Sequence, residues 1–301
     1  MQAVPAHLKG RHFTRVADWT REELETALDL ADELKALQRE RTEHRLLPGR
    51  GVGIVFEKPS LRTRVSFEVG VAQLGGFAVH LTSDEIGLGR REATQDVALV
   101  LSRYLDALMI RTFAQALVEE LAEHATIPVV NGLTDDEHPC QALADFMTIR
   151  ERLGRVDGVR LAYVGDGNNV CVSLAHMAKL LGAEFVAAAP PDYRPPTGTP
   201  GTVVDDPSEA AAGADVLYTD VWTSMGQEDE QAARLEAFRG YTIDEGLVAE
   251  AAPDAIVLHC LPAHYGEEIT AEIAHGPRSA ILDQAENRLH AQKALLALVV
   301  R

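Results

Sequence analysis

Two kinds of hydrophobic pattern alternate along this chain. Apolar side chains recur at helical spacing from Leu24 to Leu37, and Thr20 with Glu23 forms a capping-box pattern just before them. Beyond Pro48 the pattern changes to short apolar runs separated by longer helical stretches. The first pattern predicts an amphipathic helix, and the second predicts strands that alternate with helices.

Eight short apolar runs are candidate strands. Four lie in the first half, at residues 52–56, 77–81, 107–110 and 127–130, and four in the second half, at 160–164, 184–188, 216–220 and 255–260. Regular alternation with helices is typical of parallel sheets that are covered on both faces. We therefore expect an α/β fold with two parallel sheets flanked by helices.

The length also favours two domains, since 301 residues exceed the roughly 100–200 residues of one domain. The boundary is expected at residues 131–137, where a strand ends and a polar run precedes a helix that starts near Pro139. A last helix is expected at 289–300, after a polar break at 283–288. Its periodicity does not decide which domain it packs on.

Charge narrows the possible ligands. Lys and Arg number 28 and Asp and Glu number 46, so the net charge is 28 − 46 = −18. Such a chain repels phosphate backbones, which excludes general nucleic-acid binding. An anionic substrate must therefore meet a local positive pocket.

Cysteine spacing indicates a reducing compartment, and hydropathy indicates a protein without a membrane span. Cys140, Cys171 and Cys260 lie in separate segments without CxxC spacing, against a disulfide framework or a structural zinc site. No apolar run approaches the roughly 18 residues of a membrane span, and the first residues lack a signal-peptide pattern. We expect a soluble, cytoplasmic protein without a membrane partner.

Polar residues gather just after the candidate strands, where parallel sheets bind their ligands. Six such segments occur, at residues 57–64, 111–112, 138–141, 166–169, 220–226 and 259–263. In the first, Ser60 is placed to cap a helix whose first turn holds Arg62 and Arg64. Free amides and guanidinium groups there would bind an anion. Alternatively, Ser60 only caps and the arginines form surface ion pairs, although the helix dipole disfavours cations in a first turn.

The remaining segments each allow more than one role. Asn168 and Asn169 offer amide hydrogen bonds or simply a turn and a helix cap, and no GxGxxG or GxxxxGK[ST] motif is present. His138 is an exposed loop residue, a metal ligand or a donor to a carbonyl oxygen. The histidines lack HxxxH and HExxH spacing, so we expect no metal site. Cys260 is a buried small side chain, or the nucleophile of a Cys/His hydrolase, which nothing else favours.

Together these segments resemble the aspartate/ornithine carbamoyltransferase family over nearly the whole chain. The residues from Ser60 to Arg64 resemble the family's carbamoyl-phosphate signature, usually Ser-Thr-Arg-Thr-Arg, and Arg111 and the segment 138–141 resemble its other contacts to that substrate. The segments 220–226 and 259–262 resemble the loops of the family's ornithine-specific members. Their order and spacing make the resemblance specific.

The resemblance implies an architecture and an assembly. Residues 1–133 with 285–301 would bind carbamoyl phosphate, and residues 134–284 would bind L-ornithine. The final helix would pack back on the first domain. A homotrimer, or a multiple of trimers, is also implied.

The resemblance further implies a reaction, in which the neutral δ-amine of ornithine attacks the carbonyl carbon of carbamoyl phosphate and expels phosphate. No cofactor is chemically required. The residues implied to hold phosphate are Ser60, Leu61 by its backbone, Arg62, Thr63 and Arg111. Those implied to polarise the carbonyl are His138, Arg62 and Arg288, and Gln141 would hold the carbamoyl nitrogen. Cys260 and the backbone of Leu261 would lie beside the reacting groups, and Asn169, Asp220, Ser224 and Met225 by its backbone would bind the α-groups of ornithine.

Two departures and several rival functions accompany the resemblance. Leu61 replaces the usual Thr, and Gly87 stands where the family often has Gln or His reaching a neighbouring subunit. Aspartate as acceptor would need cations for a second carboxylate, which Asp220 and the residues Ser224 and Met225 argue against. A carbamoyltransferase for acetylornithine or putrescine stays open as a rival function. A catalytically silent subunit would have lost site groups, whereas Arg62, Arg111, His138 and Cys260 are all present. A nicotinamide dehydrogenase is excluded for lack of a glycine fingerprint.

Overall fold

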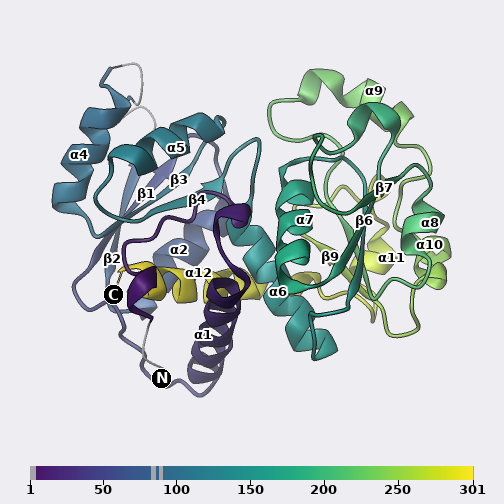
Figure 1. Cartoon of the computed structure of the whole chain (residues 1–301). Helices are drawn as coiled ribbons and strands as arrows, with labels where there is room; N and C mark the ends of the chain where they lie inside the picture. The colour runs from purple at the N-terminus through teal and green to yellow at the C-terminus, as the bar shows by residue number, and fades with distance from the viewer. Residues whose placement is uncertain (1–4, 83–85, 88–90, 301) are drawn as a thin grey trace. The chain divides into compact units, whose positions relative to one another are not determined.

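The computed structural model describes residues 5–82, 86–87 and 91–300. The chain divides into two compact units, Met1–Met147 with Asn287–Arg301, and Thr148–Glu286 (Figure 1). The first unit's N-terminal part ends at Met147, inside the helix Pro139–Leu153 and 14 residues after the expected domain limit at 133 (147 − 133). The second unit ends at Glu286, two residues after the expected limit at 284 (286 − 284). The domain limits inferred from the resemblance stay a prediction.

The first unit is built on a four-stranded parallel sheet with the order β2-β1-β3-β4. Its strands are β1 (Gly51–Phe56), β2 (Phe77–Thr82), β3 (Ala107–Arg111) and β4 (Val129–Leu133). Its helices are α1 (Arg21–Arg39), α2 (Leu61–Gln73), α4 (Thr94–Tyr104) and α5 (Gln115–His124), together with parts of α6 (Pro139–Leu153) and α12 (Ile281–Val300).

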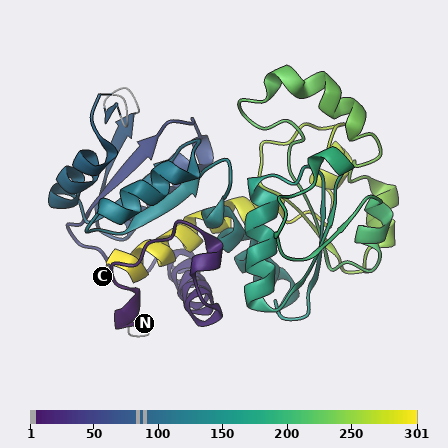
Figure 2. The same ribbon diagram turned by 45° about the horizontal axis from the view of Figure 1, so that its top comes forward.

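Alternating side chains of this sheet form two packed layers. Val55 and Ile110 pack with Val97 of α4 and Val118 of α5 on one face. On the other face α2 packs along β1 and β2. Helix α12 lies against α2, where Gly70 leaves room for Leu289 and the Lys293 side chain (Figure 2). The C-terminal helix thus packs on the first unit.

The second unit has a five-stranded parallel sheet with the order β7-β6-β5-β8-β9. Its strands are β5 (Arg160–Val164), β6 (Glu184–Ala188), β7 (Thr202–Val204), β8 (Val216–Thr219) and β9 (Ile256–His259). Its helices are α7 (Asn169–Leu181), α8 (Pro207–Ala211), α9 (Gln231–Ala237), α10 (Glu245–Glu250) and α11 (Ala271–Ala274). In each sheet the strand order reverses beside the first strand. The loops after β1 and β3 therefore meet in the first unit, and those after β5 and β8 meet in the second.

The α/β fold with two parallel sheets is confirmed, and so is the first helix with its capping box at Thr20 and Glu23. Strand β7, of only three residues, was missed. The run at 127–130 is displaced, because β4 begins at Val129. Pro128 precedes that strand and has no N–H for the ladder, although its carbonyl accepts from Leu108.

The expected polar break at 283–288 is wrong, because α12 runs without interruption from Ile281 to Val300. Three of the polar side chains in this stretch, Gln284, Asn287 and Arg288, are buried. Gln284 accepts from the His259 amide at 2.9 Å, and Asn287 accepts from Lys35 at 2.7 Å. Polar residues on a helix therefore mark buried hydrogen bonds here and not a loop.

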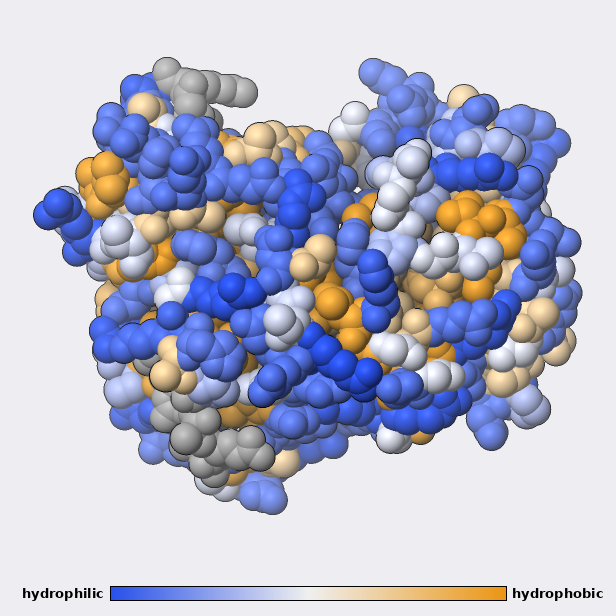
Figure 3. Space-filling view, viewed as in Figure 1, coloured by the Kyte–Doolittle hydropathy of each residue, from blue (hydrophilic) through white to orange (hydrophobic). Residues whose placement is uncertain are grey.

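The surface reflects the acidic composition. Hydrophilic residues cover most of the face seen in Figure 3, with apolar residues in small scattered groups. Among the described residues, no helix combines the length and hydropathy that crossing a bilayer requires.

Candidate active site

Helix α2 begins at the predicted anion site. The Ser60 hydroxyl caps the helix by accepting from the Thr63 amide at 3.2 Å. The first amides of a helix have no partner within it, so they and the positive end of the helix dipole can bind an anion. Leu61 is 75% exposed, and its lost hydroxyl leaves the backbone N–H at that position in place.

The two arginines of this turn differ in their surroundings. Arg64 forms an ion pair with Glu68 at 2.9 Å on the helix surface. Arg62 is partly buried and has no ion-pair partner among the residues that the structure describes. The surface-pair alternative therefore applies to Arg64 and not to Arg62.

A buried hydrogen-bond network joins three predicted residues that lie far apart in the sequence. Arg288 of α12 donates to the Gln141 side-chain oxygen at 2.6 Å and to the Thr63 hydroxyl at 3.2 Å. Gln141 donates through its amide group to Asp145 at 2.7 Å. The network fixes the Gln141 oxygen toward Arg288, and that oxygen retains a second lone pair for a substrate N–H.

His138 is buried at the start of α6, where its carbonyl accepts from the amides of Gln141 and Ala142. Burial lowers the pKa of the imidazole well below its ordinary value, and the positive charges of Arg288, Arg111 and Arg62 lower that pKa further. His138 is therefore neutral at physiological pH, and three guanidinium groups act on it. These charges make the surroundings of His138 locally positive, as an anionic substrate would require in so acidic a chain.

Arg111 ends strand β3 and is buried beside the segment that follows β1. Its carbonyl accepts from the Glu57 amide at 2.9 Å, and the Thr112 hydroxyl donates to the Glu57 carboxylate. Lys58, which the sequence analysis did not single out, is buried here and is neutralised by Asp135. Its place in a strand-end segment was the only sequence signal for it.

In the second unit, Asp220 lies at the centre of a buried polar cluster at the end of β8. One carboxylate oxygen accepts from the Cys260 thiol at 2.9 Å, and the other accepts from the Asn168 amide group at 2.9 Å. The loops after β5, β8 and β9 are adjacent because these strands are neighbours in the sheet. The carboxylate is held in place by neutral donors and can bind an ammonium group.

Asn168 has both of the roles that its sequence position allowed. Its side-chain oxygen caps α7 by accepting from the amides of Val170 and Cys171 at 3.0 and 3.2 Å, while its nitrogen reaches Asp220. Asn169, the predicted ligand, is the first residue of α7 and is partly buried. The sequence analysis did not include Asn168 among the binding residues, and the paired asparagines after a strand were the available signal.

The loop that carries Ser224 and Met225 is anchored at its base. The Ser224 amide donates to the Gln227 side chain at 3.2 Å, and Met225 is exposed. Arg234 of α9 donates to the Trp222 carbonyl at 2.8 Å and to Asp166 at 2.9 Å. Arg234 also forms an i,i+4 ion pair with Glu230 at 3.0 Å, but its contact with Asp166, 68 residues earlier, has no local sequence signal.

The loop after β9 is held by a second buried pair. The Leu261 amide donates to Nδ1 of His259 at 2.8 Å, and Nε2 of His259 donates to the Glu268 carboxylate at 2.9 Å. Leu261 has a φ of +59°, a region that residues with a side chain rarely adopt. The two hydrogen bonds fix the backbone next to Cys260 in this conformation.

The predicted site residues thus form one set in each unit. The first unit holds Ser60, Leu61, Arg62, Thr63, Arg111, His138, Gln141 and Arg288, and the second holds Asn169, Asp220, Ser224, Met225, Cys260 and Leu261. The first set can bind an anion and polarise a carbonyl, and the second can bind an ammonium group.

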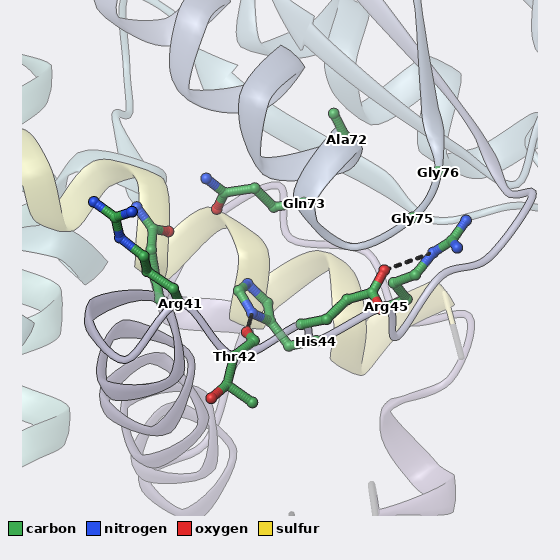
Figure 4. Close-up of a pocket in the computed structure, with 10 residues that line it drawn as sticks. Arg41, Thr42, His44, Arg45, Ala72, Gln73, Gly75 and Gly76 are labelled. Carbon is green, nitrogen blue, oxygen red and sulfur yellow. Dashed lines mark hydrogen bonds and ion pairs between the residues drawn. The ribbon is translucent and has the colours of Figure 1, made fainter.

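A separate hollow of about 510 Å³ lies in the first unit, between the ends of α1 and α2 (Figure 4). Its lining includes Arg41, His44 and Gln73, and none of the predicted site residues. Cations near helix C-termini offset the negative end of the helix dipole, which explains them without a ligand.

Gly87, one of the two departures from the family pattern, has a φ of +60°. A Cβ at this position would lie 2.8 Å from Cβ of Arg91. A Gln or His at this position would therefore require a shift of the neighbouring backbone. The residues that follow Gly87 in the same loop, Leu88 and Gly89, lie outside the described residues.

Comparisons with known proteins agree with this geometry. Residues 11–151 match the model of the aspartate/ornithine carbamoyltransferase carbamoyl-P binding domain, and residues 157–299 match that of the Asp/Orn binding domain. The ornithine carbamoyltransferase of Acidothermus cellulolyticus is 55% identical, with 96% of both chains covered. That of Methanoculleus marisnigri is 53% identical, with 96% of this chain and 97% of the relative covered.

Solved structures show the same similarity. The ornithine carbamoyltransferase from Pyrococcus furiosus has a TM-score of 0.94 at 48% identity, covering 97% of this chain and 98% of the other. An N-acetyl-L-ornithine transcarbamylase mutant has a TM-score of 0.85 at 30% identity, covering 96% of this chain and all of the other. With both domain models matched and relatives above 50% identity over nearly its full length, this chain belongs to the aspartate/ornithine carbamoyltransferase family.

Proposed function

We propose that this chain is a carbamoyltransferase that converts carbamoyl phosphate and L-ornithine into L-citrulline and phosphate. The observation that carries the proposal is the buried carboxylate of Asp220, 6% exposed, between the neutral donors Cys260 and Asn168. A buried carboxylate whose hydrogen-bond donors are neutral favours a positively charged ligand. The α-ammonium group of an amino-acid acceptor supplies that charge.

The phosphate half of the reaction belongs to the first unit. The N-terminus of α2 and the guanidinium groups of Arg62 and Arg111 would hold the phosphate and stabilise its charge as it leaves. Neutral His138 and Arg288 would donate to the carbonyl oxygen, which becomes an oxyanion as the amine attacks. A neutral imidazole suits this role, since it donates a hydrogen bond without releasing its proton.

The amine half belongs to the second unit. The δ-amine, in its neutral form, would form the new C–N bond and give the tetrahedral oxyanion. As the oxyanion collapses, the C–O bond to phosphate would break, and the departing phosphate would take the proton that the nitrogen loses. The Cys260 hydrogen is engaged by Asp220, so the sulfur lone pairs can accept from an amine N–H. Cys260 would therefore orient the amine, and the backbone of Leu261 would lie beside it. Asn169, Ser224 and the backbone of Met225 would bind the remaining α-groups.

The acceptor is distinguished by charge. Acetylornithine carries a neutral amide in place of the α-ammonium, and putrescine lacks the α-carboxylate. Asp220 fits the charged group of ornithine better than the amide. The acetylornithine alternative is also less favoured by the comparisons, at 30% identity against about 50% for ornithine enzymes.

We also propose a homotrimer in a reducing, cytoplasmic compartment. Val65 and Val69 on α2, and Phe77 on the edge strand β2, are 47%, 40% and 54% exposed. An edge strand with apolar neighbours is a surface that proteins cover. The thiol of Cys260 must stay reduced in order to donate to Asp220. Sedimentation velocity on Val65→Asp and the unchanged chain tests the assembly, which would dissociate in the variant.

A citrulline-formation assay tests the function, with ornithine, acetylornithine, putrescine and aspartate offered separately beside carbamoyl phosphate. We expect ornithine to be used at least tenfold more efficiently than the others. The variant Asp220→Asn should lose ornithine binding, because its charge is removed while the side-chain shape is kept. Equal use of acetylornithine, or unchanged affinity in Asp220→Asn, would contradict the proposed acceptor.

A further inference from the structure

Glu268 is a fully buried carboxylate with one unsatisfied oxygen. It is 0% exposed, and its Oε1 accepts from Nε2 of His259 at 2.9 Å and from the His264 amide at 2.6 Å. Its Oε2 is buried and has no hydrogen-bond partner among the described residues. An orphaned carboxylate oxygen is costly inside a protein, which is a reason to look for a water or an ion beside it.

Two further metal-ligating side chains lie beside Glu268. A ring nitrogen of His264, a carboxylate oxygen of Glu267 and one of Glu268 all lie within 4.8 Å of one another. Nδ1 of His264 is 3.6 Å from Oε2 of Glu267. Two ligands that each lie about 2.0–2.2 Å from one tetrahedral ion are roughly 3.3–3.6 Å apart, so this pair needs little movement to share an ion.

The backbone of this segment is fixed before any ion arrives. The Glu267 amide donates to the His264 carbonyl at 3.0 Å, and the Ile243 amide donates to the Glu268 carbonyl at 2.9 Å. The Thr242 hydroxyl donates to the Glu267 carbonyl at 2.6 Å. Little conformational freedom of the backbone would be lost on binding.

The chemistry of the three donors indicates the class of ion. One imidazole and two carboxylates suit a borderline divalent ion such as Zn²⁺, whereas Mg²⁺ prefers oxygen ligands and keeps several waters. The side chains of His264 and Glu267 are 44% and 28% exposed, so solvent can reach the cluster and fill a remaining coordination position. The two carboxylates would also attract a cation.

We propose that His264, Glu267 and Glu268 form a binding site for a divalent transition-metal ion, with Zn²⁺ as its probe. The proposal does not depend on the proposed function. His259 would support the site from behind, since its imidazole donates to the Glu268 carboxylate and accepts from the Leu261 amide. Metal at this site would therefore stiffen the loop next to Cys260 without contacting a substrate. The sequence analysis tested only HxxxH and HExxH spacing and did not weigh an H-x-x-E-E segment.

A second cluster of possible ligands, Asp220, His259 and Cys260, has to be separated from this one in the experiment. Metal-free protein carrying Cys260→Ser serves as the parent, because it lacks the thiolate ligand. Zn²⁺ is titrated calorimetrically into the parent and into the parent with His264→Ala or with Glu267→Gln. Both substitutions leave Glu268 and the His264 backbone amide in place, and circular dichroism checks the fold.

Two control variants test whether a change in Zn²⁺ affinity comes only from the loss of any negative charge or of any surface histidine. His124→Ala removes a partly exposed histidine of α5, and Glu272→Gln removes one exposed carboxylate of α11. We expect one Zn²⁺ per parent chain, an affinity at least tenfold lower in His264→Ala and Glu267→Gln, and no change in the controls. Removing a residue that only hydrogen-bonds to a metal ligand typically lowers metal affinity about 10–100-fold, so removing a ligand itself should lower it at least as much.

Cobalt gives a readout that is independent of affinity. Co²⁺ bound in the chain with Cys260 intact should show visible d–d bands without the near-ultraviolet charge transfer of a cobalt–thiolate bond, because the donors are nitrogen and oxygen. Failure of the parent to bind Zn²⁺ would leave a water as the partner of Glu268 and overturn the proposal. Unchanged affinity in His264→Ala, or a charge-transfer band in place of the d–d spectrum, would also overturn it.

Discussion

The thiol of Cys260 donates to the carboxylate of Asp220 at 2.9 Å. This contact keeps the proton on sulfur, because a thiolate beside a carboxylate would place two negative charges together. A thiol in this state is a poor nucleophile. The relationship therefore favours direct attack of the substrate amine over a covalent carbamoyl-cysteine.

Replacement of Cys260 tests this mechanism. Cys260→Ser should lower turnover by roughly tenfold without abolishing it, because a hydroxyl can keep one hydrogen bond of about 1 kcal/mol. Cys260→Ala, which keeps none, should lose more. The measurement is kcat at saturating substrates. A Ser variant that binds both substrates but has no activity, or a carbamoylated cysteine detected by mass spectrometry, would show that the mechanism is covalent.

Arg62 is expected to act on charge and not on packing. Arg62→Ala should lower kcat/KM for carbamoyl phosphate by roughly 100–1,000-fold, the usual cost of losing one group that stabilises a developing charge. Its melting temperature should change little. Arg64→Ala is the matched control in the same helical turn, since Arg64 pairs with Glu68 on the surface, and it should cost far less. Equal losses in the two variants would refute the separate role of Arg62.

His138 should make stability depend on acid pH. Burial lowers its folded-state pKa well below 6.5, so below pH 6.5 the unfolded chain binds a proton that the folded chain excludes. The folded state therefore loses stability as the pH falls, by about 1 kcal/mol between pH 7.5 and 5.5. His138→Gln should lack this contribution. Urea unfolding of both proteins at the two pH values measures the difference, and identical pH dependence would contradict the buried neutral imidazole.

Lys293 should make the stability of the fold depend on pH in the alkaline range. The residue is 0% exposed, and its ammonium group donates to Gln38, His44 and Gln73 at 2.9–3.0 Å. Burial lowers its pKa from 10.5 to about 8. Between these values the unfolded chain binds more protons, so stability should rise as the pH increases from about 8 toward 10.5. Comparison with Lys293→Met isolates this rise from other alkaline titrations.

That comparison is made as a difference in the free energy of unfolding at pH 8 and pH 10. The stability of the unchanged chain relative to Lys293→Met should increase over this interval. A constant difference would mean that the lysine titrates at its ordinary pKa and is solvated in solution.

Local sequence patterns predicted most of the helices and strands and the helix cap at Ser60, but they missed β7 and misplaced the start of α12. The spacing of apolar residues predicted both parallel sheets, and Ser60 before Arg62 predicted the anion site, because capping depends on residues only three positions apart. The strand-end segments were found for a similar reason. Parallel strands end at a common edge, so residues after each strand are brought together whatever separates them in the sequence.

The sequence by itself thus determined the fold class, the capped N-terminus of α2 and the polar loops at the strand ends. Only the tertiary structure decided which side chains meet. Arg288 reaches Thr63 across 225 positions, and Asn168, which was not among the predicted binding residues, reaches Asp220 across 52. It also decided that α12 begins at Ile281, since its polar residues are satisfied by buried partners. Such contacts depend on how helices and strands pack, and hydrophobic periodicity reports which face is buried but not which polar group lies opposite it.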